Sequence, residues 1–348
     1  MDQTAKTYLR KWHKLPSSTT TNMLHHSRGS SIPLPSFLYD HGHVINETNP
    51  SDETIVEAIK EETEFNGKLR TSHQGFVTTN NPNINSKNLK RLYDEELSNQ
   101  ARTLETQGEW AKLYELQSKD TSFNAITKGL SEQTYMWLLK ASSNSAPTMS
   151  YLLRINRAMS SACPRCGKSP ETLHHALNNC TNALENGLYT WRHNKVLSVL
   201  HQACSEEVPE PWEVRVDLAT SPGDTIPSDI IPTMQRPDLT LINRQEKEFI
   251  LVELTICWDI YHQPAKERKE QRYASLTSEL NELGWKSQLL TIEIGSRGYS
   301  SNDTASNLKK LFNKKKQRSN LLTRMNQEAI TASYCIFIHR KVLSWSPT

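Results

Sequence analysis

Two apolar runs separated by a short polar segment form the clearest pattern of hydrophobic and polar positions along the chain. The first run covers residues 236–242 and the second covers residues 249–256, and both are rich in side chains that favour strands. Between them lies the polar segment Asn243-Arg244-Gln245-Glu246-Lys247-Glu248. Strand, short polar loop and strand in this order predict an antiparallel β-hairpin.

Each predicted strand carries one carboxylate, Asp238 in the first and Glu253 in the second. If the turn is centred between Gln245 and Glu246, the two acids lie opposite each other on one face, with Cβ atoms about 5 Å apart. A shift of one residue would place them on opposite faces. Two carboxylates this close favour a cation between them, and such oxygen ligands suit Mg²⁺ or Mn²⁺. The alternative is a strand that has one polar face and no site.

Helical patterns predominate on both sides of the hairpin. Before it, helices are expected at Tyr8–Leu15, over residues 51–65, within residues 88–118 and after the capping residue Ser131. A polar stretch over residues 71–87 is interpreted as a loop. After the hairpin, Pro264 suits a first helical turn, and residues 288–294 predict another strand.

Three of the six cysteines lie close together, in Cys163-Pro164-Arg165-Cys166 and at Cys180. A Cys-x2-Cys turn brings two thiolates onto one ion, and a histidine four or five residues before a final cysteine completes a tetrahedron. His175 and His174 are separated from Cys180 by four and five intervening residues, respectively. Three thiolates and one imidazole favour Zn²⁺. The alternative is three free cysteines near a helical turn.

Pro237-Asp238 in one strand and Glu253 in the next resemble the core pattern of PD-(D/E)XK nucleases. That pattern has a lysine where this chain has Thr255. The restriction-like endonuclease of site-specific non-LTR retrotransposons commonly has the same departure, with the lysine on the following helix. By this resemblance, Lys269 is the first choice for the catalytic lysine and Lys266 the second.

Other segments are similar to the same family in the same order. They are the Cys/His cluster with His175 as its histidine, Trp191-Arg192-His193-Asn194-Lys195-Val196, Gly295-Ser296-Arg297-Gly298 after the later strand, and, more weakly, the thumb-like segment Tyr8–Pro16. The resemblance covers residues 130–300 well and the remainder loosely. It implies an α/β (α+β) fold with a restriction-endonuclease-like mixed-sheet core flanked by helices, preceded by a zinc knuckle and an all-α N-terminal region.

The domains implied are a thumb-like remnant over residues 1–50, a helical scaffold over 51–160, a CCHC zinc knuckle over 161–182 and an endonuclease domain over 186–348. The implied activity is metal-dependent nicking of a DNA target for target-primed reverse transcription. Asp238 and Glu253 would bind Mg²⁺ or Mn²⁺, Lys269 would activate water, and Tyr273 would contact the phosphate. Cys163, Cys166, His175 and Cys180 would bind a structural Zn²⁺.

The distribution of lysines and cysteines adds to this interpretation. The formal net charge is only +3, but lysines gather at positions 309–316, where a solvated helix face, a phosphate-contacting patch and a nuclear-import signal are all possible interpretations. Expected nucleic-acid contacts are Arg192, His193, Arg297, Lys314, Lys315 and Lys316. The scattered cysteines favour a reducing compartment, so an intracellular, nuclear location is expected, with DNA and element RNA as partners and no membrane.

No Asp-Asp dipeptide occurs, so the chain is not expected to be a polymerase by itself. Other parts of a retrotransposon polyprotein are further expected partners. Two other interpretations remain open: a nucleic-acid-binding remnant that no longer cuts, and an interaction protein that works through its helical scaffold.

Overall fold

The computed structural model describes residues 2–12, 68–70, 76–78, 86–105, 108–168, 170–221 and 223–345. The acidic helix predicted over residues 51–65 lies outside these ranges. The chain divides into two compact units, of which the first comprises residues 1–112 with 142–145 and the second comprises residues 113–141 with 146–348. Residues 113–141, grouped above with the scaffold, thus belong to the second unit.

The first unit contains helices and one short antiparallel pair of strands. Its elements are α1 (Asp2–Trp12), β1 (Lys68–Arg70), β2 (Phe76–Thr78), α5 (Ser86–Arg102) and the first part of α6 (Gly108–Leu116). The pairing of Leu69 with Val77 corrects the prediction of an all-α N-terminal region. Valine, phenylalanine and threonine in β2 favour an extended backbone.

The second unit is built on a four-stranded mixed sheet of order β3-β4-β5-β6. The strands are β3 (Trp212–Val216), β4 (Leu239–Asn243), β5 (Glu248–Cys257) and β6 (Lys286–Gly295). The first three are antiparallel, whereas β5 and β6 are parallel. A parallel pair needs a long crossover, which the 3-10 turn η2 (Asp259–Tyr261) and α12 (His262–Glu282) supply. The predicted mixed sheet flanked by helices is therefore confirmed.

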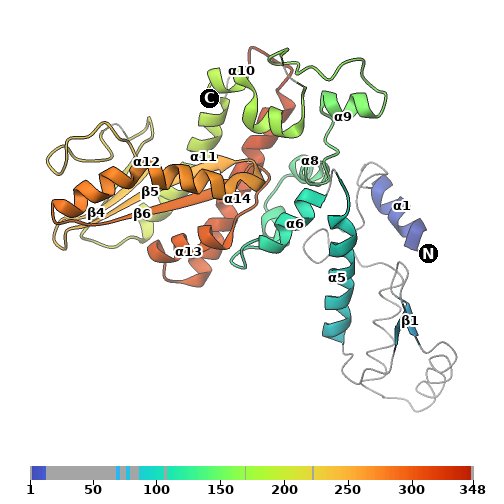
Figure 1. Cartoon of the computed structure of the whole chain (residues 1–348), viewed down its shortest axis with the longest axis horizontal. Coiled ribbons are helices and arrows are strands. Elements are labelled where there is room, and N and C mark those ends of the chain that lie inside the picture. The colour runs from blue at the N-terminus through green and yellow to red at the C-terminus, as the bar shows by residue number, and fades with distance from the viewer. Residues whose placement is uncertain are drawn as a thin grey trace. The chain divides into compact units, whose positions relative to one another are not determined.

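Helices cover both faces of this sheet. On one face, α11 (Leu188–Glu207), α13 (Asn302–Leu311) and α14 (Lys315–Ile338) pack on apolar side chains that include Leu241, Val252 and Ile292. On the other face α12 packs through Tyr273 and Leu276, and Figure 1 shows this orange helix running along the strands. Alternate residues of β5 therefore face different helices.

The β4–β5 hairpin has the register that the sequence predicts. Asn243 pairs with Glu248 and Leu239 with Val252, so the turn is centred between Gln245 and Glu246. The side-chain oxygen of Asn243 accepts hydrogen bonds from the backbone N–H groups of Gln245 and Glu246, both at 3.1 Å. Asparagine fixes tight turns in this way.

Short helices lie before, within and directly after the Cys/His segment. They are α7 (Phe123–Lys128), α8 (Glu132–Ser142), α9 (Met149–Arg154), the π-helix η1 (His175–Asn179) and α10 (Thr181–Glu185). The predicted cap at Ser131 is confirmed, since its hydroxyl accepts the Thr134 N–H at 3.2 Å. Among the described residues, no helix combines the length and apolar character needed to cross a bilayer.

Candidate functional site

The β4–β5 hairpin brings the two predicted carboxylates together. The pairing of Leu239 with Val252 places Asp238 and Glu253 at the next step of the ladder, as the sequence register predicts. Oδ2 of Asp238 accepts a hydrogen bond from the backbone N–H of Leu254 at 2.8 Å. Asp238 is therefore fixed against the strand that carries Glu253.

Glu253 lies beneath α12 with 1% of its side chain exposed. Its Oε2 atom forms an ion pair with the ammonium group of Lys269 on α12. Its Oε1 atom is buried and has no hydrogen-bond partner among the described residues. A buried carboxylate oxygen without a partner costs free energy, and a cation held between Glu253 and Asp238 would satisfy it. The two carboxylates could therefore offer oxygen ligands to a divalent ion.

His193 on α11 completes the surroundings of Asp238. Its Nε2 atom lies 3.2 Å from Oδ2 of Asp238 and 3.2 Å from the carbonyl oxygen of Leu254. Its Nδ1 atom lies 3.1 Å from the side-chain oxygen of Asn194. An imidazole held at both nitrogens has a fixed orientation. His193, a predicted nucleic-acid contact, thus positions Asp238.

The charges of Asp238 and His193 stabilise each other. Burial alone would raise the pKa of Asp238, but the hydrogen bond and charge of His193, with the charge of Lys269, lower it. Burial alone would lower the pKa of His193, but its hydrogen bond to Asp238 raises it. For Glu253, burial and the charge of Asp238 raise the pKa, and Lys269 opposes them only in part. Asp238 is the more readily ionised of the two acids.

The other two residues predicted to be catalytic, Tyr273 and Lys266, also lie on α12 and have further partners. Tyr273 is fully buried and donates a hydrogen bond to the carbonyl oxygen of Arg236 at 3.1 Å. Its hydroxyl therefore holds the segment that enters β4, and it also lies close enough to Glu253 for a side-chain hydrogen bond with that carboxyl group. The phosphate contact of Tyr273 stays a prediction. Lys266 forms an ion pair with Asp303 at 2.8 Å. Of the two candidate lysines, Lys269 is the one that reaches Glu253.

Two of the predicted nucleic-acid contacts, Arg192 and Arg297, lie inside the protein. Arg192 is 1% exposed and donates to the hydroxyl of Ser333 at 3.0 Å. Arg297 is 3% exposed and forms an ion pair with Asp259 at 2.8 Å. Both guanidinium groups stabilise the junctions of distant segments and present no surface to a phosphate.

The C-terminal lysines, in contrast, are exposed. The end of α13 and the start of α14 form a basic surface, here called the lysine corner, which consists of Lys309, Lys310, Lys314, Lys315 and Lys316. Arg318 is separate, because it is buried and pairs with Asp120 at 3.2 Å. The predicted contacts Lys314, Lys315 and Lys316 are therefore available to an anionic partner.

The Cys/His segment forms a compact group of potential metal ligands. One ligand atom from each of Cys163, Cys166, His175 and Cys180 lies within 4.8 Å of all the others. Sγ of Cys166 is 3.4 Å from Nε2 of His175. The alternative ligand, His174, instead packs its ring against Trp258 and Tyr261, at centroid distances of 5.3 and 5.5 Å. The predicted Cys3His set could hold a zinc ion.

Tyr189, which the sequence did not single out, supports this group from α11. Its hydroxyl accepts the backbone N–H of Cys180 at 3.0 Å and lies 3.2 Å from the carbonyl oxygen of Ala176. The hydroxyl thus joins the start of η1 to the last ligand. No local sequence signal marks this role, because Tyr189 lies outside the cysteine pattern.

Without a cation, the Cys/His group is electrostatically unfavourable to thiolates. Burial raises the pKa of Cys180 to about 12 and also raises that of Cys163. Burial lowers the pKa of His175, which favours the neutral imidazole that binds metals. A zinc ion deprotonates coordinating thiols, so the group changes from buried thiols to bound thiolates when zinc is present.

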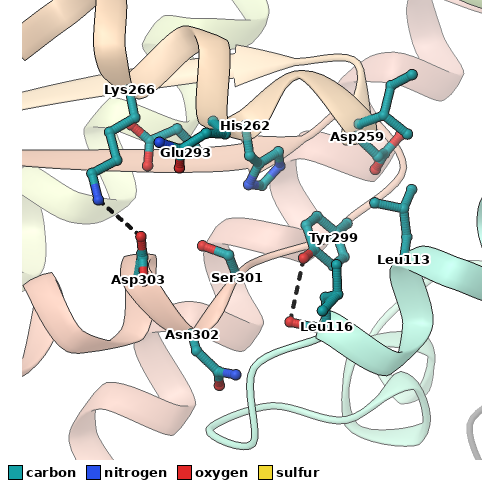
Figure 2. Close-up of a pocket in the computed structure, with 12 residues that line it drawn as sticks. Leu113, Leu116, Asp259, His262, Lys266, Glu293, Tyr299, Ser301, Asn302 and Asp303 are labelled. Carbon is teal, nitrogen blue, oxygen red and sulfur yellow. Dashed lines mark hydrogen bonds and ion pairs between the residues drawn. The ribbon is translucent and has the colours of Figure 1, made fainter.

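A second polar region, not predicted from the sequence, lies farther along the same face of the sheet. Glu293 on β6 stands beside Thr255 on β5, and burial raises its pKa to about 7. Figure 2 shows Glu293 with His262 and Lys266 at one side of a pocket. A lone acid in a predicted apolar strand was the available signal for Glu293.

No protein-family model matches this chain, and the search of curated proteins finds no match to it.

Proposed function

We propose that this protein is a metal-dependent DNA endonuclease of the PD-(D/E)XK type, related to the restriction-like endonuclease of non-LTR retrotransposons. One observation carries the proposal: Asp238, Glu253 and Lys269 converge, and Oε1 of Glu253 is left unpaired there. A hairpin with two opposed acids, followed by a helix that returns a lysine to them, is the arrangement expected of that family. In this proposal, the mixed sheet is a restriction-endonuclease-like core.

Each residue has a distinct task in the proposed reaction. Asp238 and Glu253 would bind Mg²⁺ or Mn²⁺, which when bound lowers the pKa of a coordinated water and polarises the phosphate. Lys269 places a positive charge against the charge that develops on the phosphate in the transition state. His193 holds Asp238 ionised and oriented.

The Cys/His group is proposed to be a structural zinc knuckle. Its ligands are contributed by a turn, a π-helix and the start of α10, and structural zinc supplies folding energy to such short segments. With the lysine corner, it would help to bind nucleic acid. In the intact family, a nick of this kind supplies the primer for reverse transcription, so the wider proposal includes other parts of such a polyprotein as partners and a nuclear location.

The test is nicking of supercoiled plasmid in Mg²⁺ or Mn²⁺ by the wild type and by Asp238→Asn. We expect the substitution to lower the nicking rate more than about 100-fold, because a bound metal contributes several kcal/mol to transition-state stabilisation. Asp229→Asn is the matched control, since Asp229 is exposed and pairs with Arg244 at 2.7 Å away from the acids. Equal nicking by all three proteins would show that the site is assigned wrongly.

A binding protein that does not cut is the second candidate. It is favoured by the fact that the chain itself already neutralises both acids, Glu253 through Lys269 and Asp238 through His193. In that case a folded, zinc-loaded wild type binds DNA but gives no nicks in either metal.

A further inference from the structure

A pocket of about 350 Å³ lies beside the start of α12, at the ends of β5 and β6. Figure 2 shows the imidazole of His262 between the Lys266–Asp303 ion pair on one side and Tyr299 on the other. Leu113 and Leu116 form part of its apolar wall. Pockets of this volume are large enough for a small planar ligand.

Two buried polar side chains in this pocket carry atoms that have no hydrogen-bond partner among the described residues. His262 is 8% exposed, and neither of its ring nitrogens has a hydrogen-bond partner among the described residues. Glu293 is 2% exposed, and its Oε1 atom is also without a partner there. Buried polar atoms are nearly always hydrogen-bonded, so three such atoms beside one cavity make it a candidate binding site for a polar ligand.

The protonation states of these groups define what they can bind. Burial lowers the pKa of His262 to about 4, so its ring is neutral and offers one donor and one acceptor. Burial raises the pKa of Glu293 to about 7, so its carboxyl can donate as well as accept. The complementary ligand carries adjacent donors and acceptors on a neutral edge.

The charged side chains of the pocket disfavour simple ions. Lys266 is paired with Asp303, and Asp259 with Arg297, so no cation is left over to bind a phosphate. The ammonium of Lys266 would repel a divalent cation. Among the described residues, the only group of three or more His, Cys, Asp and Glu side chains close enough together to hold a metal is the Cys3His set, so no such group lines this pocket.

The position of the pocket relates it to the two carboxylates. In the parallel register, Glu253 is beside Thr291 and Thr255 is beside Glu293. Glu293 therefore lies on the same face as Glu253 and two residues farther along the strands, a rise of about 7 Å. That is close to the separation of neighbouring nucleotides in an extended strand.

We infer that this pocket accepts one unstacked nucleobase from the strand whose phosphate lies at Asp238 and Glu253. The inference rests on the proposed function. His262 and Glu293 would bind the hydrogen-bonding edge of the base, while Tyr299, Leu113 and Leu116 would contact its apolar surfaces. The pocket would thereby fix which phosphate reaches the carboxylates.

The experiment is a scan with a single-stranded oligonucleotide in which each base in turn is replaced by an abasic site. Affinity is measured by fluorescence anisotropy with Ca²⁺ in place of Mg²⁺, for DNA and RNA versions of the strand. We expect the abasic site to weaken wild-type binding at least about fivefold at one position, the lower bound for losing one base contact. The two versions distinguish a deoxyribose strand from a ribose strand as the source of the base.

The variant His262→Phe keeps the ring and removes its nitrogens, and Glu293→Gln is a second variant of conserved shape. Both variants should bind the intact strand more weakly than the wild type does. In both variants, an abasic site at the sensitive position should cause no further loss of affinity. His201→Phe is the matched control, on α11 and outside the pocket lining. Two results would overturn the pocket inference alone. In the first, the wild type nicks plasmid but its affinity is the same for every position of the abasic site. In the second, the affinities of His262→Phe depend on the abasic position as those of the wild type do. If no strand binds, both proposals fail.

Discussion

Glu293 combines near-complete burial with a pKa raised to about 7, so its ionisation is linked to folding. An unfolded glutamate loses its proton near its model value of 4.5. Between that value and about 7, the folded protein binds a proton that the unfolded chain has released. The free energy of unfolding therefore falls as the pH rises through this window.

Substitution of Glu293 by glutamine should remove this part of the pH dependence. We expect the wild type to lose on the order of 3 kcal/mol between pH 4.5 and pH 7 relative to Glu293→Gln, since each pKa unit corresponds to about 1.4 kcal/mol. Urea unfolding of both proteins across the window measures the difference. Glu246→Gln, at an exposed position in the hairpin turn, should follow the wild type. Parallel curves for wild type and Glu293→Gln would contradict the assignment.

The sequence predicts the environment of some side chains and not of others. Asp238 and Glu253 could be paired in advance, because their positions are symmetric about a recognisable turn. Arg192, Arg297 and Tyr273 were given surface roles, but each is buried by segments far away in the chain. The local sequence around an arginine does not show whether an acid or a hydroxyl far away in the chain buries its side chain and pairs with it.

Among the elements, the hairpin and the Cys/His segment were predictable because their interactions are local in sequence. The ligand set of the latter depends on a turn, η1 and a final cysteine that lie within one short stretch. The edge strand β3 was not predicted, nor was the pocket under α12. Both depend on long-range pairing, of β3 with β4 and of β5 with β6 across the α12 crossover.

Zinc binding tests the Cys/His element directly. The purified protein should contain a single zinc ion per chain by elemental analysis, and His175→Ala should lose most of it and unfold at a lower temperature. His174→Ala is the matched control, because its ring packs on Trp258 and it is not one of the grouped ligand residues. Retention of zinc by His175→Ala together with loss in His174→Ala would reverse the ligand assignment.

At the scale of the whole molecule, the small net charge conceals an uneven distribution of charge. The lysine corner gathers five exposed lysines at the end of α13 and the start of α14, whereas the buried Arg297 and Arg318 form ion pairs with internal acids. A formal charge summed over the chain therefore underestimates the local attraction for a polyanion.

Salt dependence measures this attraction. If Lys314, Lys315 and Lys316 each contact a phosphate, replacing all three by glutamine should make the slope of log affinity against log salt shallower by about 3. The control is the double variant Lys247→Gln with Lys286→Gln. It removes two exposed lysines in the β4–β5 turn and at the start of β6, outside the lysine corner, and should leave the slope unchanged. An unaltered slope in the triple variant would place the nucleic-acid interface elsewhere.

The pairing of Asp238 with Glu253 across the hairpin also has a consequence for the comparison of homologues. Their meeting depends on the pairing of β4 with β5 and not on the number of residues in the turn that joins them. Surface turns accept insertions and deletions readily, so the interval between the two acids can drift over evolutionary time while their spatial partnership persists. Distant homologues of this protein would then share the two acids in three dimensions. A sequence motif with a fixed number of residues between the acids would not detect such homologues.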